Sequence, residues 1–333
     1  MKRVFSMLVA IVAATMSFAQ SSMLATLSHN GEITTYYGAT ALRDAYNASQ
    51  HGDIITLSSG SFAAVNIEKA LTIRGAGMQV DTITKTYPTI IAGNFDINIP
   101  DSVEQRLTME GLYNNSTVTV YGTLMNASFL KDRFFRITYI NPSITRMKNL
   151  TFIHCMISTQ VQIPSESSAS FISSYVANPY GNSSSSSVFE FSNCFVLNFN
   201  NVYNSTFTNC ILYGSNSSFY LSSSNSAFYC LGKSSTNNMF DFMTNTTNTN
   251  FTGEFNALFK TYTGAYSDTE TFELTDAAKA QYLGGDGKEV GMYGGSLPFD
   301  PVPTNPQITK CNVASKSTAD GKLSVDIEVS VTE

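Results

Sequence analysis

Histidine and cysteine, the side chains that most often hold transition metals, are scarce in this chain. Its 333 residues include 3 histidines and 5 cysteines, with no Cys-x₂-Cys or Cys-x₄-His spacing. Structural zinc sites need closely spaced ligands of this kind, so the sequence predicts no metal site. There is also no glycine-rich phosphate-binding motif, and no cofactor is expected.

Positive charge is scarce as well. The chain has 19 lysines and arginines against 25 aspartates and glutamates, which gives a formal net charge of −6 at pH 7. Nucleic-acid binding needs a basic footprint, and an anionic membrane surface attracts basic segments. Neither partner is expected for this chain.

Long apolar runs are missing except at the start. Lys2 and Arg3 precede an apolar stretch over Val4–Phe18, and Ser17-Phe18-Ala19 fits a small-x-small cleavage site. This pattern is typical of a signal peptide, predicted over residues 1–19 with cleavage near Ala19. The stretch is too short to favour a membrane span, and no later stretch is long enough. The mature protein is therefore expected to be secreted, or periplasmic or held at the cell surface.

What the chain does have is a repeat of apolar anchors spaced 16 to 23 residues apart. A turn-forming residue follows most anchors two positions later, and the predicted structural turns are Gly75, Gly93, Gly111, Asp132, Asn193 and Asn209. Such residues tolerate the left-handed backbone that a sharp bend requires. A repeat of this length, made of strand-forming residues, indicates a β-solenoid with one coil per repeat. The anchors are Leu57, Ile73, Ile91, Met109, Leu130, Phe152, Phe171, Phe191, Phe207, Phe228 and Phe251.

Cysteines recur inside this repeat. Cys155, Cys194 and Cys210 each follow an anchor phenylalanine by three residues, and we expect them to stack inside the coils as small apolar side chains. An odd number of cysteines in an oxidising compartment leaves at least one unpaired. A Cys194–Cys210 bridge is an alternative that parallel Cβ vectors disfavour.

The repeat has distinct ends. Residues 20–56 are predicted to form an N-terminal cap with a helix over 39–49, and residues 57–259 form the coils. Residues 260–300 break the repeat and hold a short helix over 276–283, capped by Thr275. Residues 301–333 read as a linker followed by a β-hairpin around Asp320-Gly321.

Three segments carry a family resemblance. Ala41–Ala45 with Gly52–Leu57, the apolar-x-Asn-Cys coils, and Gly287–Gly295 together resemble right-handed parallel β-helix proteins of the pectate-lyase-like superfamily, many of them secreted by bacteria. The resemblance implies an all-β fold, a right-handed parallel β-helix of about ten coils with an N-terminal capping helix and a C-terminal β-strand tail. It implies no single activity, because this fold carries lyases, hydrolases, epimerases and adhesins.

A lyase of this kind needs carboxylate-bound calcium and a basic residue that abstracts a proton. The most charged coils offer Glu110, Lys131 and Arg133, with Glu110 and Lys131 expected to stack on one outward face. The alternative is a solvated ion pair without catalytic role. The coils contain no Asp-Asp pair or Asp-x-Asp triplet, and calcium is expected only if the lyase reading holds. His154 occupies a turn position, and we expect it to be structural.

A second candidate site lies in the weakly charged half of the chain. Tyr180, Tyr203, Tyr213 and Tyr220 occur among asparagines and serines, and aromatic rings beside amides suit sugar binding. The alternative is that these rings fill the interior.

Three functions follow, in order of preference. The first is a non-enzymatic β-helix scaffold at the cell surface that binds glycans or acts as an adhesin, with a polysaccharide or cell-surface glycan as partner. The second is a polysaccharide-active enzyme, either a lyase or a glycoside hydrolase. The third is a structural module whose C-terminal strands dock on a partner; the oligomeric state stays open.

Overall fold

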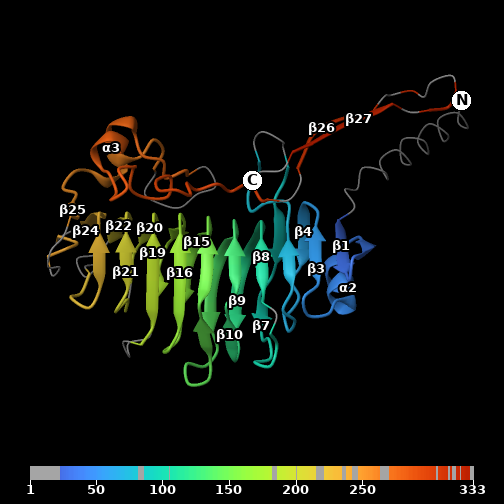
Figure 1. The fold of residues 1–333 in the computed structure, drawn as a ribbon, viewed down its shortest axis with the longest axis horizontal. Helices are drawn as coiled ribbons and strands as arrows, with labels where there is room; N and C mark the ends of the chain where they lie inside the picture. The colour runs from blue at the N-terminus through green and yellow to red at the C-terminus, as the bar shows by residue number, and fades with distance from the viewer. Residues whose placement is uncertain are drawn as a thin grey trace, which may run out of the picture.

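The chain folds into a parallel β-solenoid of about 9 turns, which confirms the predicted fold class (Figure 1). The computed structural model describes residues 23–81, 86–104, 106–181, 186–199, 201–214, 221–234, 238–241, 247–262, 270–304, 307–313, 316, 320–322 and 324–330. The predicted signal peptide over residues 1–19 and the predicted ligand residue Tyr220 lie outside these ranges. Among the described residues, no helix is long and apolar enough to cross a membrane.

Two long sheets form the walls of the solenoid. Sheet A has 11 strands in the spatial order β2 (Glu32–Tyr37), β1 (Leu24–His29), β3 (Ile54–Leu57), β5 (Thr72–Arg74), β8 (Thr108–Glu110), β11 (Ser128–Leu130), β14 (Leu150–Ile153), β16 (Ser168–Ile172), β19 (Val188–Ser192), β21 (Thr206–Thr208) and β23 (Ser226–Phe228). Its strands are parallel from β3 onward, whereas β1 is antiparallel to both neighbours.

Sheet B is parallel throughout and faces sheet A across the core. Its 12 strands comprise β4 (Gly60–Ala63), β6 (Thr89–Ala92), β9 (Leu112–Val120), β12 (Arg133–Tyr139), β15 (Met156–Gln162), β17 (Tyr175–Val176), β20 (Phe195–Leu197), β22 (Ile211–Gly214), β24 (Leu231–Ser234) and β25 (Thr249–Asn250), with β7 (Phe95–Ile97) beside β9 and β18 (Pro179–Tyr180) beside β15. A small parallel pair, β10 (Thr123–Met125) and β13 (Arg146–Lys148), completes the coils.

Alternation along each strand sends one row of sheet A side chains into the core. In this row the rings of Phe129, Phe152, Phe171, Phe191 and Phe207 stack nearly parallel, with centroids 4.6 to 5.1 Å apart. Each ring is buried. Such offset stacking adds to the burial of apolar area, so the row fixes how each coil sits on the next.

Five of the eleven predicted anchors do not occupy this row, namely Leu57, Ile91, Leu130, Phe228 and Phe251. The register puts Phe129 on the row in place of Leu130. It also puts Ala227 there in place of Phe228, which is 47% exposed. A slip of one residue turns a side chain to the opposite face of a strand, and apolar neighbours at these points hid the slip in the sequence.

The residue two positions after each core row residue makes the turn toward sheet B. At Gly111, Lys131, His154, Ser173, Asn193, Asn209 and Tyr229 the φ angle lies between 45° and 66°. We call these seven residues the turn row. The turn predicted at Asp132 is therefore made by Lys131, and Asp132 is the buried residue that follows it. Gly93 also has a positive φ, on sheet B, whereas Gly75 does not.

The next position along the chain points into the core and carries the cysteines. Cys155, Cys194, Cys210 and Cys230 are buried free thiols, which confirms the predicted interior placement. Each thiol donates to backbone carbonyls, as when Cys194 Sγ contacts the carbonyl oxygens of Phe171 and Ser192, both at 3.3 Å. Burial raises the pKa of the Cys155, Cys210 and Cys230 thiols, so these side chains are weakly nucleophilic.

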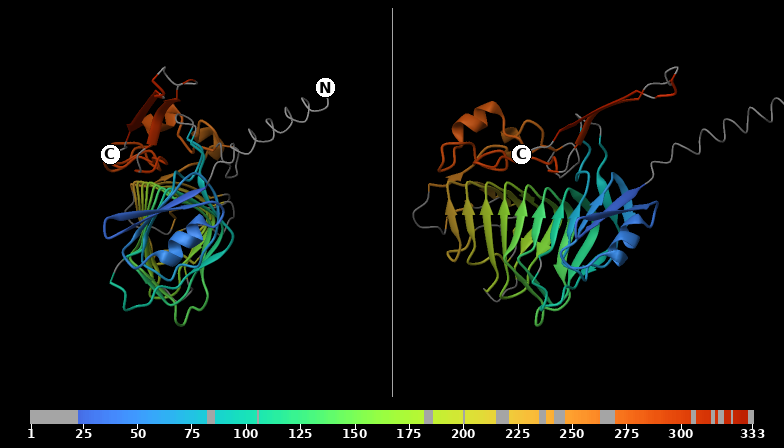
Figure 2. Two further views of the ribbon diagram at one scale, coloured as in Figure 1. Left: turned by 90° about the vertical axis from the view of Figure 1, so that its right-hand side faces the viewer. Right: turned by 45° about the vertical axis from the view of Figure 1, so that its right-hand side comes forward.

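The helix α2 (Ala41–Ala48) covers the first coil, as Figure 2 shows end-on. It buries Ala41, Leu42 and Ala45 against the strands. The N-cap residue Thr40 makes no side-chain cap bond; its hydroxyl donates to Asp44 instead, at 2.6 Å. At the other end Lys69 Nζ donates to the carbonyls of Tyr46 and Ser49, at 2.6 and 2.7 Å, and satisfies groups that a helix end leaves free.

The segment after the coils folds back onto sheet B. It contains the 3₁₀ helix η1 (Phe255–Leu258) and the helix α3 (Asp276–Gln281), whose first turn is capped by the Thr275 hydroxyl as predicted. Apolar side chains of this segment form a second core with the outward row of sheet B, including Tyr175, Phe195 and Ile211. Sheet B is therefore buried on both faces at these coils, which explains its apolar outward residues there.

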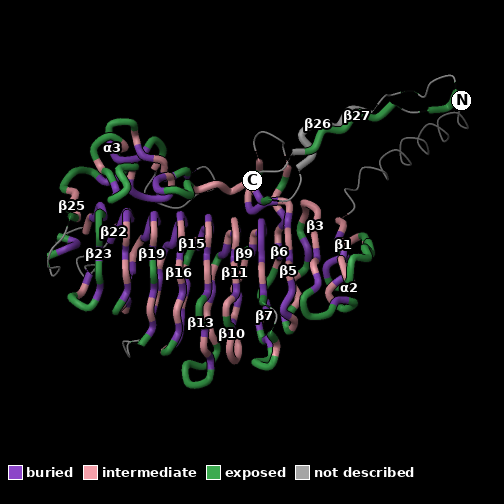
Figure 3. The backbone as a smooth tube through the Cα atoms, in the orientation of Figure 1, coloured by how far each residue is buried: buried purple, intermediate pink, exposed green. Residues whose placement is uncertain are grey.

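The last two strands, β26 (Gln307–Val313) and β27 (Val325–Ser330), form the predicted antiparallel hairpin. The hairpin stands away from the coils (Figures 1 and 2). On β27 the side chains of Val325, Ile327 and Val329 are 52 to 56% exposed, so one face of this strand is apolar. Figure 3 shows β27 as exposed.

A matched pair of substitutions tests the register. Phe207→Ala removes a buried ring from the core row and is expected to cost about 3–5 kcal/mol of unfolding free energy. Phe228→Ala removes an exposed ring and is expected to change it by less than about 1 kcal/mol. Urea unfolding followed by circular dichroism measures both. Equal losses would show that Phe228 also belongs to the core row.

Candidate functional site

A strap formed by residues 284–304 covers the turn row along the solenoid (Figure 1). As the strap runs toward the C-terminus, it contacts coils that lie successively closer to the N-terminus. The amide of Gly285 donates to Asn209 Oδ1 at 2.9 Å, and the Leu297 carbonyl lies 3.3 Å from His154 Nε2. Pro303 reaches the space beside Gly111, where a Cβ would lie 2.9 Å from it. The strap thus binds one coil after another along the same ridge.

Glu110, predicted as catalytic, is one of the groups that hold the strap. Its side chain is 4% exposed and contacts Arg74 Nε at 3.4 Å. Its Oε1 accepts hydrogen bonds from both the amide and the hydroxyl of Thr304, the former at 2.8 Å. With Arg74 and Thr304 against it, the Glu110 carboxylate has little surface left for a ligand.

Lys131 also holds the strap. Its Nζ forms an ion pair with Asp300 at 2.8 Å and donates to the Val302 carbonyl, and its side chain is 12% exposed. The predicted stacking of Lys131 on Glu110 is wrong, because the register pairs Glu110 with Leu130. Lys131 lies on the turn row above Gly111 instead.

Arg133 lies beyond the turn, on sheet B, with its guanidinium carbon 4.3 Å from the ring centre of Tyr113. This is a cation–π contact. The three residues predicted for a lyase site therefore lie on one sheet, the turn and the other sheet, and the structure does not gather them around one open groove.

Asp132, directly behind the strap, is fully buried. Its Oδ1 accepts a hydrogen bond from the Leu112 amide at 2.8 Å, while Oδ2 has no hydrogen-bond partner among the described residues. Burial raises the pKa of this carboxyl well above its ordinary value, and the nearby Glu110 adds to the rise. A neutral Asp132 fits this environment, because an unpaired buried charge is costly.

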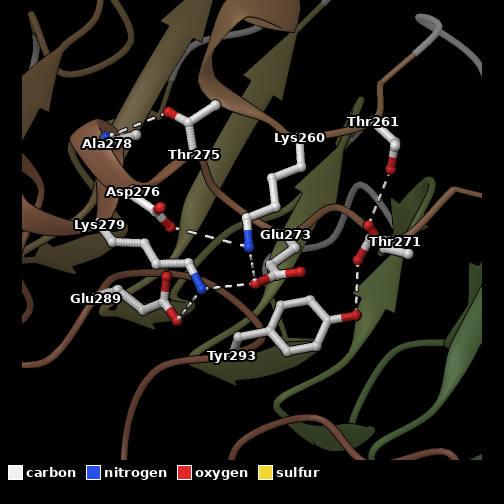
Figure 4. A network of polar contacts seen from close by, with 10 residues as sticks. All are labelled: Lys260, Thr261, Thr271, Glu273, Thr275, Asp276, Ala278, Lys279, Glu289 and Tyr293. Atoms are coloured by element: carbon white, nitrogen blue, oxygen red, sulfur yellow. Dashed lines mark hydrogen bonds and ion pairs between the residues drawn. The ribbon is translucent and has the colours of Figure 1, made fainter.

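A cluster of charged side chains links α3 to the residues before and after it in the closing segment (Figure 4). Glu273 Oε1 lies 2.7 Å from both Lys260 Nζ and Lys279 Nζ, and Glu289 lies 3.7 Å from Lys279. The two lysines lower the pKa of Glu273, whereas burial raises the pKa of Glu289. Opposed pKa values can mark an acid–base pair. Here, however, both lysines bind the Glu273 carboxylate directly, which suits an ion-pair clamp better than a nucleophile.

The predicted tyrosines fall on different surfaces. Tyr213 stacks on Phe255, with ring centres 4.3 Å apart, and belongs to the second core. Tyr180 is half-buried on β18, and its hydroxyl accepts a hydrogen bond from Asn201 Nδ2 at 3.0 Å. Tyr203 follows Asn201 by two residues and is also half-buried. Of the three predicted tyrosines that the structure describes, Tyr180 and Tyr203 lie on adjacent coils.

Tyr180 belongs to a polar cluster that the sequence did not reveal. Gln162 Oε1 accepts hydrogen bonds from the Thr138 hydroxyl at 2.6 Å and from Arg136 Nη2 at 3.3 Å. Gln162 pairs in register with Tyr180. Burial raises the pKa of Tyr139, whose side chain packs partly against the interior core, and the nearby Tyr180 adds to the rise. We call these six residues the Arg136 cluster: Arg136, Thr138, Tyr139, Gln162, Tyr180 and Asn201.

The Arg136 cluster has an unsatisfied cation at its centre. No carboxylate among the described residues pairs with Arg136, and its buried Nε has no hydrogen-bond partner there. All six side chains are partly exposed. The sequence pattern that could have indicated this cluster is the polar–apolar–polar alternation in Arg136-Ile-Thr138 and Gln160-Val-Gln162. This alternation puts the polar side chains on one outward face.

A second open surface lies on sheet A. A hollow of about 330 Å³ is lined by parts of β16, β19 and β21, including Ser170, Glu190 and Thr206. Ser170 donates to Glu190 at 2.9 Å. The lining offers hydroxyls and a single carboxylate, without an aromatic ring on its outward side or a cation.

No group of three or more metal-ligating side chains gathers in the described part of the chain. Comparison with known proteins adds no functional assignment: no family model, no curated protein and no solved structure matches the chain. Membership of the pectate-lyase-like superfamily therefore stays a prediction, while the β-solenoid is established.

The burial of Asp132 predicts that the stability of the fold depends on pH. The folded protein keeps this proton at pH values where the unfolded chain, with a pKa of about 3.9, has released it. The stability associated with Asp132 is thus complete below about pH 4 and falls as the pH rises toward the folded pKa.

Asp132→Asn keeps the acceptor for the Leu112 amide and removes the ionisation. We expect the variant to unfold at higher urea concentration than the parent at pH 7, with a difference that shrinks toward pH 4. Urea titrations across this pH range measure it. A difference that does not change with pH would contradict a neutral Asp132.

Proposed function

We propose that this protein is an exported, non-enzymatic scaffold that binds glycans through the Arg136 cluster. The observation that carries the proposal is a guanidinium without a carboxylate partner among the described residues, set beside Tyr180 and the amides of Gln162 and Asn201. Sugar recognition commonly combines a flat aromatic side chain with a few fixed polar groups. The coils supply the rigidity that such a surface needs.

Arginine sets the class of glycan. A guanidinium matches the planar carboxylate geometrically and binds it with two parallel hydrogen bonds. Gln162 orients the guanidinium through Nη2, and the side chain is partly exposed. The terminal nitrogens are therefore the groups that would meet a carboxylate, whereas Nε is buried. The surface therefore favours an acidic sugar, such as a uronic acid unit, over a neutral one.

The enzymatic alternative has less support. Glu110 and Lys131 are engaged by the strap, and the Arg136 cluster contains no carboxylate. Hydrolysis of a glycosidic bond needs two carboxyl groups on either side of the bond. The cluster has the groups for holding an acidic sugar but none for cleaving one.

Binding to a matched pair of polymers tests the proposal. Polygalacturonate carries carboxylates, and its methyl ester lacks the charge. We expect the protein to bind the acid form more tightly, and Tyr180→Ala to weaken binding roughly tenfold, as the loss of about 1.4 kcal/mol would. Arg136→Gln is expected to remove the preference for the acid form, because it removes only the charged partner.

Tyr87→Ala is the control, since Tyr87 is 69% exposed and far from the cluster in sequence. Calorimetry measures the affinities, and ultraviolet absorbance detects unsaturated products of a lyase. Equal binding of both polymers by parent and variants would contradict the proposal, and new absorbance would show that the protein is an enzyme.

A further inference from the structure

The N-terminal end of sheet A finishes in an open strand edge. β2 is the outermost strand and pairs with β1 alone, from Leu24 opposite Tyr37 to His29 opposite Glu32. Among the described residues, no strand and no hydrogen bond occupies its other edge. Every second residue of β2 therefore presents an unpaired N–H and C=O to solvent.

The opposite end of the solenoid is protected differently. The terminal strands there, β23 and β25, have 3 and 2 residues, whereas β2 has 6. Short edges are a common defence against pairing between molecules, as are lysine and proline on the edge. β2 has neither defence: it reads Glu-Ile-Thr-Thr-Tyr-Tyr, a sequence rich in strand-forming residues.

β2 also exposes apolar side chains. Ile33 is 72% and Tyr37 65% exposed. They are four residues apart and lie on the same face of the strand, with Thr35 between them. Apolar residues flanking a central threonine make this face symmetric about Thr35.

We propose that β2 is a self-association strand through which two copies of this chain pair antiparallel across a two-fold axis at Thr35. In this register Ile33 lies opposite Tyr37 of the second copy, and the reverse pair forms on the other side. Aromatic and β-branched residues make favourable cross-strand pairs. A two-fold interface uses the same patch on both molecules, which a self-complementary strand provides.

Backbone geometry limits the other registers. Successive residues turn their N–H and C=O groups to opposite edges of a strand, so a two-fold axis between two residues would set unpaired groups against groups already bonded to β1. The axis must pass through a residue. An axis through Thr34 would place Ile33 opposite Thr35 and leave Tyr37 outside the paired strands, so Thr35 is the better centre.

The interface is small. Six residues per copy bury less than the roughly 1,200 Å² of a standard complex, so we expect a weak dimer with a dissociation constant in the micromolar range or above. Pairing would make sheet A continuous through both molecules. If the proposed glycan binding also holds, the dimer would carry two Arg136 clusters and bind polymers with avidity.

Sedimentation equilibrium of the purified full chain, without any glycan, tests the pairing. The parent is expected to show a monomer–dimer equilibrium. Thr35→Lys places two like charges at the two-fold axis and is expected to raise the dissociation constant at least tenfold. Tyr37→Lys is expected to weaken the dimer as well, whereas Tyr87→Lys, at a similarly exposed tyrosine, leaves it unchanged.

A charge pair decides whether Thr35 is the centre. An equal mixture of Thr35→Lys and Thr35→Glu is expected to recover dimers that neither variant forms alone. A parent that stays monomeric up to about 1 mM, or a dimer that both Thr35 variants retain, would overturn the proposal. Because no glycan is present, this outcome is independent of whether the Arg136 cluster binds one.

Discussion

The left-handed turn at the turn row is the constraint on which this structure depends. From Met109 onward, the coils leave sheet A two residues after the core row, at the seven turn-row residues with positive φ. Glycine adopts this conformation freely and asparagine readily, but Lys131, His154 and Tyr229 adopt it at a cost of about 1–2 kcal/mol each. Ring stacking in the core row and the contacts of the strap offset that cost. The turns also line up into a ridge of side chains and backbone groups, and this ridge is where the strap binds.

Because the strap covers that ridge, Glu110 and Lys131 have a structural role rather than an exposed one. In the sequence, Glu110 and Lys131 resemble an exposed acid and base on neighbouring coils. In the structure they meet Thr304 and Asp300 from nearly 200 and 170 residues further along the chain. A partly buried ion pair such as Lys131–Asp300, and hydrogen bonds to a buried carboxylate such as Glu110, fix a segment in place, and removing one partner leaves the other poorly compensated. Groups free to meet a ligand lie elsewhere, on the outward surface of β12, β15 and β18.

The repeat in the sequence was sufficient to predict the solenoid and the interior cysteines, and alternation around Asp320-Gly321 was sufficient to predict the C-terminal hairpin. It was not sufficient to set the register at Phe129 and Leu130, since both are apolar and only pairing with Met109 and Phe152 distinguishes them. Tyr213 looked like a sugar platform because nothing local shows that Phe255 covers it. The Arg136 cluster escaped notice for the same reason: its members come from separate coils, and the shift in register between Phe134 and Arg136 obscures which face Arg136 occupies.

Hydrogen exchange at the strap tests most directly whether Glu110 and Lys131 are structural. The measurement compares residues 296–304 in the parent, Glu110→Gln and Lys131→Met by mass spectrometry. The account predicts that exchange in this segment speeds up by tenfold or more in both variants, while the amides of sheet A keep their protection. Unchanged exchange in the strap would contradict it, because these two side chains would then not be what holds the strap on the turn row.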